Sequence, residues 1–149
     1  MIPKEYSSEL LNELETKFGP LGIKVCNPRR VYIRLDRKKL PEAARFLYQD
    51  RGCRLSIATG IDTRDGVEIL YHFSHDASGV YYTLKVLLPK HDLSIQSLAV
   101  FLPAADWIER EIREMLGVTF VGHPNPAPLL TSDDWPADQY PLRRDFEKE

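Results

Sequence analysis

The chain has 149 residues, of which 43% are hydrophobic and 28% are charged, and its formal net charge is −2. A chain of this length fits one globular domain and buries roughly two thirds of the surface that its unfolded form exposes. The near balance of acidic and basic side chains provides no overall basic field that would attract nucleic acid or anionic lipid. We therefore expect an ordinary folded domain without a nucleic-acid partner.

The cysteine content and the hydropathy pattern disfavour further classes of protein. Cys26 and Cys53 are too few for a disulfide framework or a zinc cluster, and neither belongs to a C-x-x-C pair, so we expect a reducing compartment. The first nineteen residues carry charges throughout an apolar helical pattern, unlike a signal peptide. No stretch approaches the roughly 20 apolar residues of a membrane helix, so other subunits would have to anchor this protein to a membrane.

Three segments carry helical signals. Residues 7–19 combine a serine cap with apolar residues at helical spacing and end at Gly19-Pro20. Residues 41–52 open with proline and close with glycine, and residues 103–116 also open with proline. These patterns predict a helix in each segment.

Five segments alternate as strands do. Residues 31–35 form a half-buried pattern, and residues 23–25 can pair with them through an Asn-Pro turn. Residues 53–59 follow, and then residues 67–73 and 80–88, joined by a turn-forming Asp-Ala-Ser-Gly sequence that favours an antiparallel hairpin. We predict an α+β fold, a largely antiparallel mixed sheet with helices packed on one side.

The alternation also predicts which side chains face the core. In the first strand of the predicted meander these are Cys53, Leu55, Ile57 and Thr59, and Cys26 is placed in a core-type pattern as well. In the last strand the buried face comprises Tyr82, Leu84, Val86 and Leu88.

The last part of the chain is rich in proline. Its prolines deny the backbone a regular helix or a central strand; they are Pro124, Pro126, Pro128, Pro136 and Pro141. We predict an α+β domain over residues 1–121 and an extended C-terminal docking arm over residues 122–149, which should order fully only on its partner.

No motif of catalysis or cofactor binding stands out. His72 and His75 lie three residues apart, which on a strand turns their rings to opposite faces of the sheet and disfavours a shared metal. A glycine-rich phosphate loop, a nucleophile elbow and an H-E-x-x-H helix are absent from the sequence. We predict no catalytic, cofactor-binding or metal-binding residue.

The helix over residues 103–116 holds the densest group of polar side chains. Its apolar face is predicted to comprise Ala104, Ile108, Ile112 and Met115. Four-residue spacing allows the ion pairs Glu109 with Arg113 and Arg110 with Glu114 on the exposed side.

Glu111 is predicted to lie at the margin of that apolar face, and Glu109 nearer to solvent. A carboxylate at such a margin must find a donor, because a buried and unpaired charge costs several kcal/mol. Two roles remain open for Glu111: it braces the following loop, or it acts as a buried acid in proton transfer.

Three motifs of the second half resemble the 30-kDa subunit of complex I (NADH:quinone oxidoreductase). The motifs are Trp107-Ile108-Glu109-Arg110-Glu111, then Gly117, Phe120 and Gly122-His123-Pro124, and later Pro141-Leu142-Arg143-Arg144-Asp145-Phe146. Their order and spacing make the resemblance specific, and it extends weakly back to Tyr71-His72.

The resemblance implies a peripheral subunit with no flavin, iron–sulfur cluster or quinone of its own. It implies that the segment after the last helix runs along a large subunit related to the catalytic subunit of nickel–iron hydrogenases. A cluster-bearing small subunit would belong to the same complex, on the cytoplasmic side of the cell membrane. An extended proline-rich segment suits such docking, because it loses less entropy than a flexible one.

One departure from the family pattern concerns the branch of the family. After Pro124 the sequence is Asn125-Pro126-Ala127-Pro128-Leu129-Leu130, where complex I usually has an acidic residue and paired arginines. The later Asp133-Asp134-Trp135-Pro136 is similar to energy-converting membrane-bound hydrogenases and formate hydrogenlyases. These residues favour that branch of the family.

Three functions follow from these observations. The first is a non-catalytic assembly subunit, whose interface residues would be Trp107, Glu109, Arg110, Glu111, Phe120, His123, Pro124, Trp135, Pro141, Leu142, Arg143, Arg144 and Asp145. The second is a free-standing enzyme with Glu111 and His123 as an acid–base pair, and the third is a small-molecule binding module built on the sheet. For His123 itself we expect a hydrogen bond to local backbone or to the partner.

Overall fold

The computed structural model describes residues 6–148, whose helices and strands all lie before residue 122. The helical elements are α1 (Ser8–Phe18), α2 (Leu40–Arg45), the π-helical turn η1 (Phe46–Asp50), the 3-10 turn η2 (Pro103–Ala105) and α3 (Asp106–Leu116). The strands are β1 (Gly22–Asn27), β2 (Arg30–Arg34), β3 (Arg54–Asp62), β4 (Gly66–His75), β5 (Val80–Pro89), β6 (Ser94–Gln96) and β7 (Thr119–Val121).

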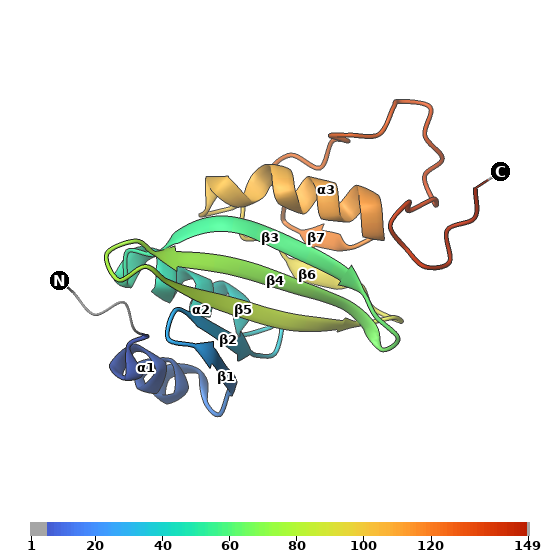
Figure 1. Cartoon of the computed structure of the whole chain (residues 1–149). Coiled ribbons are helices and arrows are strands. Elements are labelled where there is room, and N and C mark those ends of the chain that lie inside the picture. Colours follow the sequence, from blue (N-terminus) through green and yellow to red (C-terminus); the bar gives the residue numbers. More distant parts are fainter. Residues whose placement is uncertain (1–5, 149) are drawn as a thin grey trace.

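Five strands make the main sheet in the order β1-β2-β5-β4-β3 (Figure 1). The β1–β2, β4–β5 and β3–β4 pairs are antiparallel, whereas β2 and β5 are parallel. The short strands β6 and β7 pair in parallel as a separate two-stranded sheet. The predicted mixed, largely antiparallel sheet is confirmed, but the β6–β7 pair was missed, because strands of three residues carry too few alternations to recognise.

The helices pack on one face of the main sheet. The backbone N–H of Ser7, the N-cap of α1, donates to the hydroxyl of Tyr82 on β5 at 2.9 Å. On β3, a Cβ added to Gly60 would lie 2.6 Å from Leu116 of α3, so glycine permits the close approach of strand and helix. The core lies between this face and the helices, and it contains the predicted buried residues Tyr82, Leu84, Val86 and Leu88.

Local sequence explains where α1 and α3 begin and end. The Ser7 hydroxyl accepts a hydrogen bond from the backbone N–H of Leu10 at 3.1 Å, which satisfies an N–H that the first turn of a helix leaves free. At the end of α3, Gly117 adopts a left-handed φ of 76°, and its N–H donates to the carbonyl of Arg113 at 2.9 Å.

Two predictions about the strands are wrong. A bulge between Leu55 and Ile57 reverses the alternation of β3, so that Ile57 is 53% exposed and Ala58 is buried. Thr59 is exposed for the same reason. Cys26 is exposed near the end of β1, whereas Cys53 is buried, and burial raises the pKa of the Cys53 thiol to about 11.

Candidate functional site

A fully buried carboxylate, Glu109, fastens α3 to the rest of the domain. Its Oε1 accepts hydrogen bonds from the Tyr71 hydroxyl of β4 at 2.9 Å and from the backbone N–H of Leu98 at 2.8 Å. Its Oε2 accepts from the Ser97 hydroxyl at 2.5 Å. One side chain therefore ties together the sheet, the turn after β6 and the helix.

This arrangement corrects the predicted helical face. The buried positions of α3 are Glu109, Ile112 and Leu116, preceded by Ala105 of η2, rather than the face built on Ala104 and Ile108. Glu111 is only partly buried, so the prediction that it lies deeper than Glu109 is wrong. The signal that could have found Glu109 is the spacing of Ala105, Ile112 and Leu116, which places position 109 on the same face.

The surroundings of Glu109 act on its pKa in opposite directions. Burial raises the pKa of Glu109, while the hydrogen bonds from Ser97, Leu98 and Tyr71 lower it, and the net pKa lies above the usual range. Burial and the adjacent Glu109 charge raise the pKa of Tyr71 well above its ordinary value, so the Tyr71 hydroxyl stays protonated and remains a donor.

His123 closes the same region from the segment after β7. Its Nδ1 accepts from the backbone N–H of Asn125 at 3.0 Å, so the ring proton belongs on Nε2, which lies 3.1 Å from the carbonyl of Asp106. The expected hydrogen bonding of His123 to backbone is therefore present. The same Nε2 lies 3.8 Å from Oε2 of Glu109 and 3.8 Å from Oδ1 of Asp106.

The opposite side of α3 holds the C-terminal segment, residues 122–148, which contains no helix or strand. Arg110 donates from Nε to the carbonyl of Ala127 at 2.8 Å and from Nη2 to the carbonyl of Pro128 at 2.9 Å. Its side chain is only 11% exposed and lies 3.8 Å from Asp106, one turn earlier. The predicted pairing of Arg110 with Glu114 is therefore replaced by contacts to the segment.

Glu114 supplies the complementary acceptor for the backbone of the C-terminal segment. Its Oε1 accepts from the N–H of Leu129 at 2.6 Å and from the Thr131 hydroxyl at 3.0 Å, and its Oε2 accepts from the N–H of Leu130 at 2.9 Å. Burial alone would raise the pKa of Glu114, but these hydrogen bonds outweigh it, and the pKa lies below its ordinary value. Arg110 and Glu114 thus provide hydrogen-bond partners for backbone groups of residues 127–130, a proline-rich stretch that forms no β-sheet hydrogen bonds of its own.

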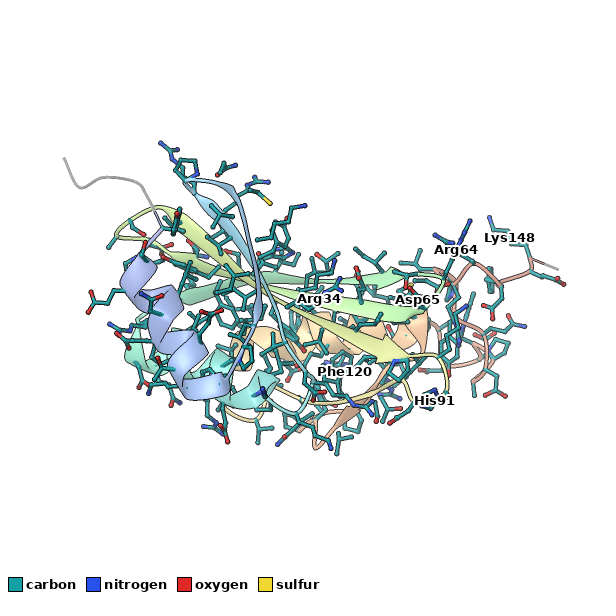
Figure 2. The ribbon with its side chains drawn as sticks, turned by 90° about the horizontal axis from the view of Figure 1, so that it is seen from below. Arg34, Arg64, Asp65, His91, Phe120 and Lys148 are labelled. Atoms are coloured by element: carbon teal, nitrogen blue, oxygen red, sulfur yellow. The ribbon has the colours of Figure 1, made fainter. Side chains whose placement is uncertain are left out.

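The segment then follows the end of α3 toward the turn between β3 and β4. The Leu142 N–H donates to the carbonyl of Met115 at 3.1 Å, and the Arg144 N–H donates to Oδ2 of Asp62 at 2.9 Å. In Figure 2, Lys148 accordingly lies at the same end of the molecule as Arg64. The path of the segment is fixed mainly through its backbone.

Several apolar side chains of this region point outward. Leu130 is 60% exposed, Leu142 is 63% exposed and Trp135 is 37% exposed, and Trp107 on α3 is 70% exposed. Trp135 stacks on Phe146 with ring centroids 6.4 Å apart. The segment is thus held by its main chain while large apolar side chains remain available for contact.

The predicted interface residues fall into two groups. Glu109 and Phe120 are buried within this chain, so their side chains can support an interface only indirectly. The side chain of His123 is likewise only 4% exposed. The others are exposed or partly exposed; they are Trp107, Arg110, Glu111, Pro124, Trp135, Pro141, Leu142, Arg143, Arg144 and Asp145. The roles of Tyr71, Ser97 and Glu114 were not predicted from the sequence, because they depend on contacts between distant segments.

Neither a metal cluster nor a membrane span is found in the described residues. Within residues 6–148, three or more His, Cys, Asp or Glu side chains nowhere gather in a way that could hold a metal ion. The helices of the same residues are too short or too polar to cross a bilayer.

The fold is similar to that of a solved respiratory complex. A chain of the membrane-bound sulfane sulfur reductase, an archaeal respiratory membrane complex, superposes with a TM-score of 0.78 at 24% identity. The match covers 93% of this chain and 84% of that chain.

Curated relatives are similar over shorter parts of their length. An NADH-quinone oxidoreductase subunit of Chloroherpeton thalassium is 38% identical over 68% of this chain and 43% of the relative. Formate hydrogenlyase subunit 5 of Escherichia coli is 37% identical over 71% of this chain and 19% of the relative. The NADH-quinone oxidoreductase C/D polypeptide of Cronobacter sakazakii is 30% identical over 92% of this chain and 25% of the relative. The chain therefore spans less than half the length of these relatives.

The family model described as "Respiratory-chain NADH dehydrogenase, 30 Kd subunit" matches residues 33–149, which include β3 to β7, α3 and the C-terminal segment. The match agrees with the motif order along α3 and the C-terminal segment. This chain belongs to the family of the 30-kDa subunit of respiratory-chain NADH dehydrogenase.

Proposed function

We propose that this chain is a non-catalytic peripheral subunit of a complex-I-related, membrane-bound oxidoreductase. In this proposal the C-terminal segment and the exposed side of α3 dock onto a hydrogenase-like large subunit, and a cluster-bearing small subunit belongs to the same complex. The chain would lie on the cytoplasmic side of the membrane, held there by other subunits. It would contribute no redox cofactor of its own.

The observation that carries the proposal is the way α3 presents the C-terminal segment. Arg110 and Glu114 bind backbone groups of residues 127–131, and the Leu130 side chain is left 60% exposed. A segment whose backbone is already satisfied loses less conformational entropy when it docks. Exposed leucine and tryptophan side chains then supply apolar area for a partner.

The architecture of the relatives supports a large partner. In the C/D polypeptide, the part similar to this chain is 25% of one longer chain. We infer that the rest of that polypeptide corresponds to the large subunit on which this chain docks. Relatives named for a formate hydrogenlyase and for an NADH-quinone oxidoreductase are almost equally similar, so the proposal covers both types of complex.

The contacts give less support to an acid–base enzyme. Such an enzyme was expected to pair Glu111 with His123, yet the carboxylates that lie 3.8 Å from His123 Nε2 belong to Asp106 and Glu109. Both ring nitrogens of His123 are engaged by backbone groups of this chain. His123 is therefore better placed to fix the chain after β7 than to move a proton.

Co-purification from the native host tests the proposal. An affinity tag before α1 should bring down a hydrogenase-like large chain and a chain that binds iron–sulfur clusters. The double variant Leu130→Ala/Leu142→Ala should reduce recovery of the large chain at least tenfold, because it removes outward apolar contacts without changing the core.

A matched control is Tyr48→Ala on η1, where the side chain is similarly apolar and 36% exposed but lies outside the C-terminal segment. This variant should recover the large chain as the wild type does. The proposal would be refuted if the tagged wild-type chain purified alone from cells whose growth requires the complex.

A further inference from the structure

The main sheet has a second face that points away from the helices, here called the open face. It is formed by the side chains that alternate with the core residues of the five strands. Tyr81 and Leu87 of β5 belong to it and are 38% and 39% exposed. Because the helices cover only the opposite face, this surface is separate from the C-terminal segment and from α3 (Figure 2).

The β3 side of the open face exposes large apolar side chains. Ile57 and Ile61 of β3 are 53% and 42% exposed, and both point outward because of the bulge in that strand. Ile61 lies opposite Glu68 of β4, which in turn lies opposite Leu87 of β5. Glu68 therefore lies between Ile61 and Leu87, and Ile57 lies opposite His72 of β4, so exposed apolar side chains alternate with polar ones on this side of the face.

The other half is basic. Arg34 of β2 lies directly opposite Lys85 of β5, and like charges at such positions repel each other. The carboxylate of Glu68 forms ion pairs with both of them, at 3.6 Å from Arg34 and 3.0 Å from Lys85. Lys24 and Arg30 form no ion pair with any carboxylate of residues 6–148. The cations on this side outnumber the carboxylates, although the whole chain has a net charge of −2.

Two hollows lie among these cations. One of about 600 Å³ is lined by Lys24, Tyr32, Arg34 and Lys85 together with neighbouring β1 residues. The other, of about 300 Å³, is lined by Arg30, Tyr32, His72 and other side chains of the face. Both are open to solvent and have guanidinium or ammonium groups in their walls, a chemistry suited to carboxylates.

His72 adds polarity but not charge to the second hollow. Its Nδ1 lies 2.9 Å from the Thr83 hydroxyl and its Nε2 lies 3.1 Å from the Thr59 hydroxyl. Burial and the nearby charge of Arg30 lower the pKa of His72, so the ring is neutral at physiological pH. The positive charge on this half therefore comes from lysine and arginine.

We propose that the open face is a second docking surface, which binds an acidic protein surface with carboxylates over the basic half and apolar side chains over Ile57, Ile61 and Leu87. A carboxylate-bearing partner would supply the second negative charge that Arg34 and Lys85, which share Glu68, lack, and it would pair Lys24 and Arg30. Nucleic acid would satisfy the cations but would leave Ile57, Ile61 and Leu87 without a partner, and the net charge of −2 would repel nucleic acid or an anionic membrane at long range.

The test uses the complex purified from the native host through a tag on this chain, compared with the isolated chain. Acetylation by an N-hydroxysuccinimide ester should be at least fivefold slower at Lys24 and Lys85 in the complex, and unchanged at the exposed control Lys38. A carbodiimide, which joins an amine to a carboxylate in contact, should link Lys24 or Lys85 to an aspartate or glutamate of another polypeptide. The substitution Arg34→Glu should reduce that cross-link at least tenfold, whereas Lys38→Glu should not.

Equal acetylation of Lys24 and Lys85 in the complex and in the isolated chain would overturn this proposal. Protection that is abolished by nuclease or detergent would also overturn it, because the ligand would then be nucleic acid or lipid. A cross-link to a second copy of this chain would overturn it as well. Loss of the large chain in Leu130→Ala/Leu142→Ala with no effect of Arg34→Glu would refute the open face alone and leave the docking of the C-terminal segment intact. If nothing co-purifies with the wild-type chain, both proposals fail.

Discussion

The two sides of α3 use the same chemistry for different purposes. Glu109 on the inner side and Glu114 on the outer side each accept three hydrogen bonds from distant parts of the chain. Glu109 is fully buried and its pKa is raised, whereas Glu114 is partly exposed and its pKa is lowered. Desolvation, not the number of donors, therefore decides the sign of the shift. The inner carboxylate holds the domain together, and the outer one positions a segment for docking.

The largest effect should come from removing the inner carboxylate. Glu109→Ala would leave the Tyr71 and Ser97 hydroxyls and the Leu98 N–H buried without their acceptor, at a cost of about 2–4 kcal/mol in the free energy of unfolding. Glu111→Ala, the matched control on the same helix, should stay within about 0.5 kcal/mol of the wild type. Urea unfolding followed by circular dichroism compares the two variants. Equal midpoints would contradict the claim that Glu109 stabilises the domain more than Glu111.

The second effect concerns the end of α3, where Gly117 contacts the C-terminal segment. Gly117 has a φ of 76°, and a Cβ there would lie 2.8 Å from the ring of Tyr140 in the C-terminal segment. Gly117→Ala should therefore cost about 1–2 kcal/mol and displace Tyr140. Thermal unfolding together with the fluorescence of nearby Trp135 measures both consequences. A partial recovery of Tm in the double variant Gly117→Ala/Tyr140→Ala would assign part of the cost to this contact, the rest being the strain of alanine at the left-handed φ. An unchanged Tm in the single variant would contradict the prediction.

A smaller effect on stability is expected on the outer side. Glu114→Ala removes the acceptor of two backbone amides, but Leu129 and Leu130 can turn to water, so the cost should be below about 1 kcal/mol. Hydrogen exchange should nevertheless become faster at these two amides. Amides of β4 and β5 serve as internal controls and should keep their protection; a loss of protection there as well would show that Glu114 supports the core.

The smallest effect is a difference in pH dependence. The raised pKa of Glu109 means that its stabilising contribution is present below the ordinary pKa of glutamate and is lost as pH rises through the raised value. The lowered pKa of Glu114 means that its contribution is present above the ordinary pKa and is lost as pH falls through the lowered value. Relative to Glu109→Gln, the wild type should lose stability as the solution becomes less acidic; relative to Glu114→Gln, it should lose stability in acid. Parallel pH profiles for all three proteins would contradict both assignments.

The sequence predicted those parts of the fold that depend on local patterns. The cap at Ser7, the end of α3 at Gly117 and the β4–β5 hairpin all follow from residues close together in the chain. The bulge at Leu55 and Ile57 was not predictable in this way, because pairing with β4 determines it. The same limit explains why Glu111 was predicted to lie deeper than Glu109, whereas Glu109 is the buried one. A helical wheel shows the relative positions of side chains but not which side of the helix packs on the sheet.

The most direct measurement of the central claim is hydrogen exchange of residues 122–146 in the isolated chain and in the assembled complex. In the isolated chain we expect slow exchange only at amides bound within the chain, such as Leu129, Leu130, Leu142 and Arg144. In the complex, protection should extend through the rest of the segment, while β3 to β5 remain protected in both states. Equal exchange of the whole segment in the two states would contradict the account, because the segment would then complete its own domain instead of docking on a partner.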